Sequence, residues 1–236
     1  MIGKGCVIAI GGNEDKRGQK SILREFVRRA GAANARIVII PSASVAPEQR
    51  AVRYSRIFAR LGVASVCSIH PERKVTPDDL VLVTNATGIF VTGGDQERLM
   101  TFLRPTGVAN AIVEAVRNGA VYAGTSAGAS ALSGRMITGS TRSRGTDIVE
   151  FGDGLGLLPT IIVDQHFSER RRLTRLISAS REHHMIGVGI DENTAMVLDG
   201  SGRIGAIGAG EITVVRPERE SIRLHMLGDS EEIDLD

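Results

Sequence analysis

The fold of this chain is decided by residues 121–130, which read VYAGTSAGAS. The segment runs from an apolar strand at 121–123 into a helix expected at 127–132, with the pattern Gly-x-Ser-x-Gly at the junction. Small residues are needed there, because a sharp turn projects the Ser126 hydroxyl while the neighbouring backbone packs closely. The pattern alone also occurs by chance in Gly-Ser turns, so its strand-to-helix setting is what favours Ser126 as a nucleophile. The same turn would aim the amide of Ala127 at a developing oxyanion.

Around this segment, short β-branched runs alternate with longer segments of helical period. This pattern predicts an α/β fold of three layers, with a mostly parallel sheet between helices. The expected strands are 7–10, 36–40, 65–69, 89–92, 121–123, 161–164 and 188–190. The expected helices are 21–30, 47–61, 96–103, 107–117, 127–132 and 168–181, the last with Ser168 as its N-cap.

The pattern changes after Glu192, where Gly, Asp and Pro separate shorter apolar runs. These runs predict C-terminal antiparallel hairpins that close the domain, at 195–198, 203–207, 211–215 and 222–227. The acidic end, 229–236, is expected to fray. With no internal repeat or linker, residues 1–236 are expected to form one catalytic domain.

Composition excludes several classes of function. Lys and Arg total 29 against 27 Asp and Glu, so the net charge of +2 gives no general attraction to nucleic acid or an anionic membrane. No window approaches the roughly 18 apolar residues of a membrane span, and the first residues lack the pattern of a signal peptide. Cys6 and Cys67 form no metal or redox spacing. We therefore expect a cytoplasmic protein without a metal or an organic cofactor.

Polar residues follow five of the expected strands, at 11–16, 93–96, 125–128, 164–167 and 191–193. Ligands of open parallel sheets bind beyond the carboxyl ends of strands, so these segments are candidates for a site. In the segment 93–96, two glycines can bring backbone N–H groups close to a ligand. The amides of Gly94 and Asp95 are therefore candidate oxyanion donors. A Gly-rich helix entry without a ligand is the alternative. A dinucleotide site is disfavoured, because the Gly-x-Gly-x-x-Gly pattern is missing from both Gly-rich loops.

A serine nucleophile needs an imidazole to take its proton, and the sequence offers five histidines. His166 ends an apolar strand and precedes a helix, so its position is the best. His70 follows a different strand and leads into a Pro-rich loop. The others occupy positions where surface roles are expected, at His183, His184 and His225.

The imidazole in turn needs a carboxylate on its second nitrogen. Asp191 and Glu192 both follow the strand at 188–190, and the residues alone do not choose between them; a turn or capping role is the alternative for either. The order along the chain would be serine, histidine, acid. Since α/β-hydrolases have the order serine, acid, histidine, this arrangement argues against an ordinary lipase or esterase.

Six blocks of sequence together resemble the cyanophycinase branch of the peptidase E family. They are GGNEDK at 11–16, FVTGGDQ at 90–96, GTSAGA at 124–129, DQHF at 164–167, the arginines 170, 172 and 175, and GIDENTA at 189–195. The resemblance implies a fold like that of class I glutamine amidotransferases. It also implies a triad of Ser126, His166 and Glu192, and so favours Glu192 over Asp191.

The resemblance further implies a substrate and its contacts. The substrate would be cyanophycin, a poly-aspartate backbone carrying arginine on each β-carboxyl, and the product β-aspartyl-arginine dipeptide. The implied substrate contacts are Gln96, Asp164, Gln165, Arg170, Arg172 and Arg175. Guanidinium groups match carboxylates bidentately, whereas without the resemblance an arginine-rich helix face would indicate only solvation.

The expected mechanism is acyl-enzyme chemistry. Ser126 would attack the β-carbonyl of an isopeptide bond, with His166 as base and then as acid toward the arginine amine. Glu150 and Asp153 are candidates for binding the substrate arginine side chain.

Three alternatives remain beside this hypothesis. The chain could be a peptidase E-like dipeptidase acting on short aspartyl or isoaspartyl peptides, or a non-catalytic small-molecule binding module of the same fold. An amidotransferase is disfavoured, because its cysteine would have to occupy position 126. We expect a homodimer, as is common for small enzymes.

Overall fold

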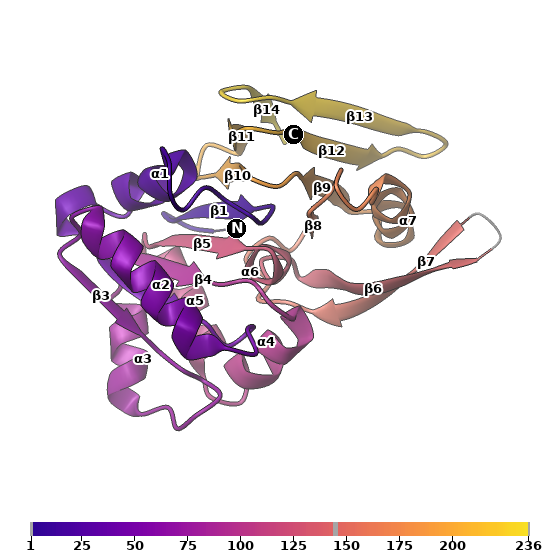
Figure 1. Ribbon diagram of the computed structural model, residues 1–236. Coiled ribbons are helices and arrows are strands. Elements are labelled where there is room, and N and C mark those ends of the chain that lie inside the picture. Colours follow the sequence, from indigo (N-terminus) through magenta and orange to yellow (C-terminus); the bar gives the residue numbers. More distant parts are fainter. Residues whose placement is uncertain (1, 144–145, 236) are drawn as a thin grey trace.

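A computed structural model describes residues 2–143 and 146–235. Its centre is an eight-stranded sheet of order β14-β11-β10-β1-β5-β4-β2-β3 (Figure 1). The strands β1, β5, β4, β2 and β3 are parallel, and β10, β11 and β14 continue the sheet in antiparallel fashion. Their bounds are β1 Cys6–Ile10, β2 Arg36–Ile40, β3 Ser65–Ser68, β4 Gly88–Val91, β5 Val121–Thr125, β10 Thr194–Leu198, β11 Arg203–Gly208 and β14 Glu232–Asp234.

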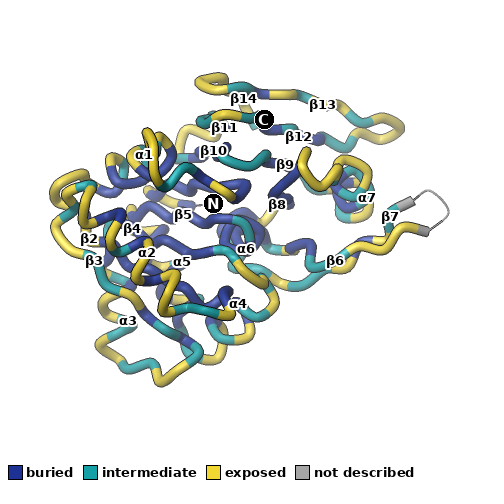
Figure 2. Tube along the Cα trace, viewed as in Figure 1, coloured by how far each residue is buried: buried dark blue, intermediate teal, exposed yellow. Residues whose placement is uncertain are grey.

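Helices cover both faces of this sheet, because its inner strands are apolar on both sides. Alternate residues point to opposite faces, so Ile8 packs in one core and Val7 in the other. The helices α1 (Ser21–Arg29) and α2 (Pro47–Arg60) bury their apolar stripes with the first core. The helices α3 (Pro77–Thr84), α4 (Gln96–Leu103) and α5 (Val108–Arg117) do so with the second. Figure 2 shows buried residues along the strands and exposed ones on the outer helix faces.

Two smaller sheets complete the structure. One has the order β13-β12-β9-β8, with α7 (Leu173–His183) beside it. The other is the hairpin of β6 and β7, which projects from the body of the protein (Figure 1). The bounds are β6 Arg135–Ser143, β7 Thr146–Asp153, β8 Ile161–Gln165, β9 Ile186–Ile190, β12 Ile212–Pro217 and β13 Ile222–Leu227; α6 (Ala127–Ser130) and the 3-10 turn η1 (Ala32–Asn34) are short.

The three-layer α/β fold and the C-terminal antiparallel strands confirm the expected fold class. The helix expected at 168–181 is wrong at its start, since α7 begins at Leu173 with Arg172 as its N-cap. Left-handed backbone at His166 and Arg171 turns the chain before the helix, so Ser168 caps nothing. The acidic C-terminal segment was expected to fray, but within it Glu232–Asp234 forms β14 and pairs with β11.

Candidate active site

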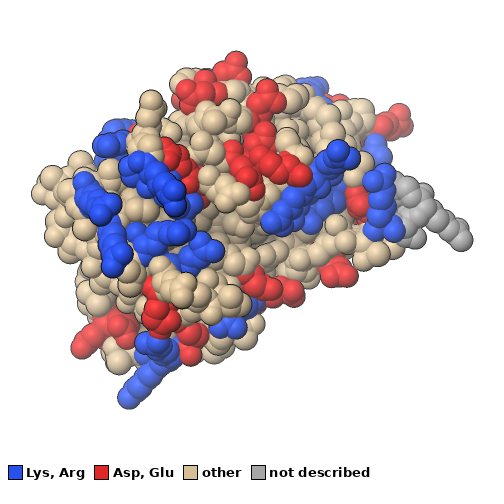
Figure 3. Space-filling model, viewed as in Figure 1, with Lys and Arg blue, Asp and Glu red and all other residues tan. Residues whose placement is uncertain are grey.

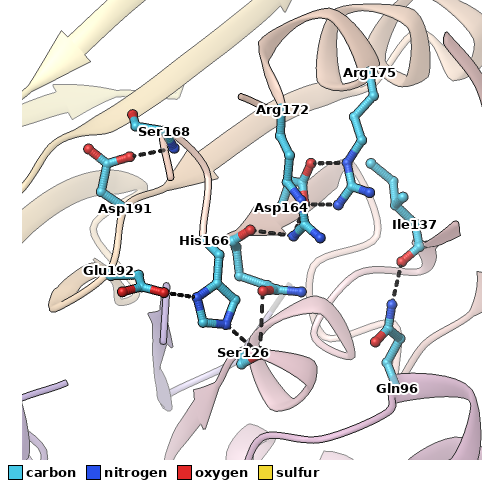
Figure 4. A network of polar contacts seen from close by, with 11 residues as sticks. Gln96, Ser126, Ile137, Asp164, His166, Ser168, Arg172, Arg175, Asp191 and Glu192 are labelled. Atoms are coloured by element: carbon cyan, nitrogen blue, oxygen red, sulfur yellow. Dashed lines mark hydrogen bonds and ion pairs between the residues drawn. The ribbon is translucent and has the colours of Figure 1, made fainter. Parts of the chain in front are cut away.

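Three side chains from separate elements form one hydrogen-bonded chain (Figure 4). Ser126 follows β5, His166 follows β8, and Glu192 lies between β9 and β10. The Ser126 Oγ lies 3.0 Å from Nε2 of His166, and Nδ1 of His166 lies 2.5 Å from Oε1 of Glu192. We call these three residues the candidate triad.

The backbone at Ser126 is strained, with φ +54° and ψ −111°, in the sharp turn between β5 and α6 that we call the elbow. Its neighbours are glycines because backbone packs against them. A Cβ on Gly124 would lie 2.2 Å from the Gly128 carbonyl oxygen, and one on Gly128 would lie 2.5 Å from that of Val91. The Gly-x-Ser-x-Gly pattern thus marks close packing between β5, β4 and α6.

Of the three candidate oxyanion donors, two have a free amide. The Asp95 amide donates to the carbonyl of Ala43 at 2.9 Å, and its carboxylate caps α4. Across the described residues, the amides of Ala127 and Gly94 donate to no protein acceptor. The Gly93 backbone lies against the serine, since a Cβ there would be 3.1 Å from Ser126 Cβ. The amides of Ala127 and Gly94 are therefore unoccupied among the described residues, whereas the Asp95 amide is occupied.

The loop after β1 holds the imidazole in place. The His166 amide donates to the Gly11 carbonyl at 2.8 Å, and the ring packs directly on Gly12. A Cβ on Gly12 would lie 2.3 Å from Cε1 of His166, so only glycine leaves room for the ring. On the other side of the site, Gln165 Oε1 accepts a hydrogen bond from Ser126 Oγ at 3.3 Å.

The carboxylate that faces His166 is that of Glu192, while Asp191 has a structural role. Asp191 accepts a hydrogen bond from the Ser168 amide at 3.0 Å (Figure 4). It also accepts one from the Glu211 amide at 3.1 Å, so it connects two turns. A hydrogen bond from the Asn13 side chain, together with one from His166, lowers the pKa of Glu192 against the opposing effect of burial. Glu192 is therefore ionised at neutral pH.

Two further residues around the candidate triad were missed at the sequence level. Asn13 bonds to the Glu192 carboxylate, and Glu169 Oε1 accepts the Glu192 amide at 3.1 Å. Asn13 lies in the first of the matching sequence blocks, but nothing in the sequence assigned it a partner.

Glu14, also missed, is a buried carboxylate directly beneath the elbow, only 3% exposed. It accepts hydrogen bonds from Thr125 Oγ1 at 2.7 Å and from the Tyr54 hydroxyl, and Lys16 Nζ lies 3.1 Å away. Burial and the negative charge of Glu14 raise the pKa of Tyr54 well above its usual value, so the phenol remains a donor. Since Thr125 immediately precedes Ser126, Glu14 holds the end of the strand that carries the candidate nucleophile.

A buried charge cluster lies beyond Gln165. The Asp164 side chain is 1% exposed and accepts from Arg172 Nη1 at 3.2 Å and from Arg175 Nε at 2.7 Å (Figure 4). Arg172 Nη1 also donates to the Gln165 carbonyl at 2.5 Å. Burial lowers the pKa of Arg172 to about 10, with Asp164 opposing this shift, so the guanidinium is still charged at neutral pH. The structure thus brings four of the candidate contact residues together.

The remaining candidate contacts lie around this cluster. Gln96 Nε2 donates to the Ile137 carbonyl at 2.9 Å, which joins α4 to β6, and Arg170 is exposed. Asp153 pairs with Arg104 and Arg135 on the exposed side of the hairpin. Glu150 sits opposite Gly139 in the same hairpin. Within the described part of the chain, neither acid contacts the candidate triad.

Residues 2–143 and 146–235 contain neither a cluster of metal-binding side chains nor a helix suited to cross a membrane. No three His, Cys, Asp or Glu side chains lie close enough together there to share a metal ion. None of the described helices combines the length and the hydropathy that crossing a membrane requires.

Comparisons with known proteins agree on one family. The model of peptidase family S51 matches residues 7–204. A cyanophycinase of Trichormus variabilis is 43% identical over 221 residues, covering 91% of this chain and 74% of the relative. A cyanophycinase of Synechococcus elongatus is 38% identical over 252 residues, with 97% and 78% covered. The crystal structure of a peptidase from an acI-B1 Actinobacterium superimposes with a TM-score of 0.75 at 22% identity over 98% of this chain and 97% of that one, which shows the same fold.

Proposed function

The chain belongs to peptidase family S51, and from this premise we propose that it is a cyanophycinase, which degrades cyanophycin to β-Asp-Arg dipeptides. The observation that carries the proposal is the hydrogen-bonded chain from Ser126 through His166 to Glu192, placed on a strained elbow beside two free amides. The relatives named cyanophycinase support the choice of substrate.

In the proposed reaction, His166 Nε2 takes the proton of Ser126 as the hydroxyl attacks a carbonyl carbon. The amides of Ala127 and Gly94 bind the oxyanion, and the ionised Glu192 stabilises the imidazolium. The tetrahedral intermediate then collapses, and His166 gives its proton to the leaving amine. Water attacks the resulting ester on Ser126, with His166 again as base, and releases the acid.

The product determines which bond breaks. A β-Asp-Arg dipeptide retains the isopeptide bond between aspartate and arginine. The bond that is hydrolysed must therefore be the backbone amide between successive aspartates, and the leaving group is an aspartate α-amine. The expected attack on the β-carbonyl is wrong on this balance, since it would release free arginine and leave poly-aspartate.

The cluster around Asp164 supports recognition of this substrate. Every unit of the polymer carries a free carboxylate on its arginine, and arginine forks bind carboxylates bidentately. Arg170, Arg172 and Arg175 supply such groups, with Asp164 holding the last two in position. Gln165 and Gln96 are proposed to orient the backbone near the scissile bond.

A peptidase E-like dipeptidase is the alternative activity, and a non-catalytic module is the alternative of another class. The decisive experiment incubates the purified protein with cyanophycin, with (β-Asp-Arg)2 and with an α-linked Asp-Arg peptide, followed by mass spectrometry. Release of β-Asp-Arg without free arginine is expected. Cleavage of the α-linked peptide alone would favour the dipeptidase. Failure of a serine-directed reagent to label Ser126 would favour the module.

Two finer expectations remain predictions. We propose a homodimer, which sedimentation analysis tests, and a cytoplasmic location, which fractionation of the host cell tests.

A further inference from the structure

A groove rich in arginine lies between the β6–β7 hairpin and the segment 170–175. Its volume is about 360 Å³, within the range of about 300–1,000 Å³ typical of ligand pockets. Of its eight lining residues, five are arginines and one is an acid, namely Arg142, Arg170, Arg171, Arg172, Arg175 and Asp147. Figure 3 shows basic side chains gathered over the α7 side of the molecule.

The charges in this groove are only partly balanced. Arg172 and Arg175 pair with the buried Asp164, but the outer arginines 142, 170 and 171 form no ion pair with any described carboxylate. Asp147 accepts a hydrogen bond from Thr174 Oγ1 at 2.5 Å, which ties the hairpin to α7. The positive charges of Arg175 and Arg170 add to burial in lowering the pKa of Arg172. Surplus positive charge in a concave site favours an anionic ligand.

One residue, Gln165, links the groove to the candidate triad. Gln165 accepts from Ser126 with its side chain and from Arg172 with its backbone carbonyl, so one residue touches both sites. On the side of the hairpin, Gln96 donates to the Ile137 carbonyl of β6, the strand that also carries Arg142. A chain that has entered the site at Ser126 can therefore extend along β6 toward the arginines.

We propose that this groove binds the arginine carboxylates of polymer units beyond the one being cleaved, and that Arg142 and Arg171 make the enzyme prefer polymer over short peptides. The inference rests on the proposed function. Each further unit brings one free carboxylate, which unpaired guanidinium groups bind as a fork. The surplus positive charge selects this carboxylate over the guanidinium of the same unit. A substrate of two units is too short to reach the outer arginines.

The test removes the two outer arginines and varies substrate length. Arg142→Ala and Arg171→Ala, singly and together, are assayed with cyanophycin and with (β-Asp-Arg)2. Because one exposed charge pair contributes about 1.4- to 5-fold, the double variant should lose about 2- to 30-fold in kcat/KM on the polymer. On the two-unit substrate, kcat/KM should change by less than about 2-fold. The polymer rate should also become less sensitive to salt.

A matched control removes two arginines from a different basic groove. Arg53→Ala with Arg56→Ala lowers the net charge equally on α2, in a groove that also contains Arg60. Unchanged polymer hydrolysis in this control supports a local role for the hairpin groove. An equal loss in the control would overturn the proposal, as would an equal loss on both substrates or no loss on either.

A binding measurement separates this inference from the proposed function. The Ser126→Ala protein is titrated calorimetrically with (β-Asp-Arg)3, with and without the two outer arginines. Weaker binding without them supports the carboxylate groove even if wild-type protein cleaves none of the substrates, in which case only the proposed function fails. Equal affinity would overturn the groove assignment.

Discussion

Among the described residues, two sets of serine, histidine and glutamate side chains are connected by nearly the same hydrogen bonds. In the second, Ser68 Oγ lies 3.1 Å from His70 Nε2, and His70 Nδ1 lies 2.9 Å from Glu72 Oε1. The corresponding distances in the candidate triad are 3.0 and 2.5 Å. We call Ser68, His70 and Glu72 the Ser68 trio. The hydrogen bonds between side chains alone thus do not distinguish the Ser68 trio from the candidate triad.

The backbone around each serine is what differs. The amide that follows Ser68 belongs to Ile69 and donates to the Ile39 carbonyl at 2.9 Å, because β3 pairs with β2. The amide that follows Ser126 belongs to Ala127 and donates to no described acceptor. An oxyanion formed at Ser68 would find no donor at that position. We therefore expect the free amide beside Ser126, rather than the three side chains alone, to distinguish the candidate triad from the Ser68 trio.

The acids of the two chains also differ in their surroundings. Glu72 binds the Ser42 hydroxyl with its second oxygen, so the Ser68 trio joins the ends of β2 and β3 as a structural tie. Glu192 instead receives Asn13 from the loop after β1, the same loop that packs against His166. The candidate triad is therefore assembled from distant segments, whereas the Ser68 trio is local.

The largest expected difference is between the variants that remove Ser126 and Ser68. Ser126→Ala should lower kcat on cyanophycin by about 10⁴- to 10⁶-fold, because the nucleophile is lost. Ser68→Ala should leave kcat within about 2-fold of wild type. Comparable losses in both variants, measured by release of β-Asp-Arg, would abolish the distinction between the two chains. Circular dichroism and thermal unfolding serve as controls for folding.

The next effect tests the glycine beneath the imidazole. Gly12→Ala places a methyl group 2.3 Å from His166 Cε1 and should lower kcat by about 100-fold, since small misplacements of catalytic groups are costly. Gly31→Ala is the matched control, with φ +111° against +106° but nothing nearer than 3.7 Å. Both should lose about 1–3 kcal/mol of stability from backbone strain. If Gly31→Ala loses as much activity as Gly12→Ala, strain rather than the ring contact is responsible.

A smaller effect is expected from the carboxylate beneath the elbow. Glu14→Gln keeps the shape but removes the charge that accepts from Thr125 and Tyr54. It should lower kcat by about 10-fold with little change in KM, because Thr125 carries Ser126, and effects of this size fit one or two lost hydrogen bonds to a charged group. Glu72→Gln makes the same change in the Ser68 trio and should leave kcat unaltered. A rise in KM with constant kcat for Glu14→Gln would contradict a role in positioning the nucleophile.

The smallest effect concerns pH. The Asn13 hydrogen bond lowers the pKa of Glu192, so Asn13→Ala should raise that pKa by less than about 1 pH unit, which an NMR titration of the Glu192 carboxyl group measures. Burial would raise the pKa of Glu72, but hydrogen bonds from Ser42 and His70 outweigh it. Ser42→Ala should therefore alter stability against pH without moving the kcat profile.

The sign of the stability effect follows from the direction of both shifts. A carboxylate whose pKa is lowered by folding stabilises the protein above its unfolded value of about 4.3 and loses that contribution as the pH falls through the folded value. Urea unfolding between about pH 3 and 6 measures it. A Glu192 pKa that is identical in Asn13→Ala and wild type would exclude the role given to Asn13.

The sequence was sufficient for the parts of the fold that depend on local pattern. Each strand with a continuous apolar run was found, because burial on both faces leaves that signature. The β6–β7 hairpin was missed, since its residues 138–142 include no apolar residue except Gly139 and none of them is buried. Helix α3 was also missed, although Thr76 and Asp79 form a capping box that could have revealed it.

For the site, the sequence located the serine and the histidine because both directly follow strands. It could not choose between Asp191 and Glu192, because the choice depends on amides at 168 and 211 that bind Asp191 in the folded chain. Glu14 was missed for a similar reason. Its partners Tyr54 and Thr125 lie far away in sequence, and only packing brings them to the loop after β1.

The position of β1 has a consequence for biosynthesis. This first strand lies between β5 and β10. The loop that follows it is held by Asn193, whose amide donates to the Gly12 carbonyl at 2.8 Å. A nascent polypeptide that has emerged from the ribosome only as far as β9 has its serine and imidazole but no acid beside them. A chain that ends before residue 192 therefore lacks the third member of the candidate triad, and we expect it to be inactive.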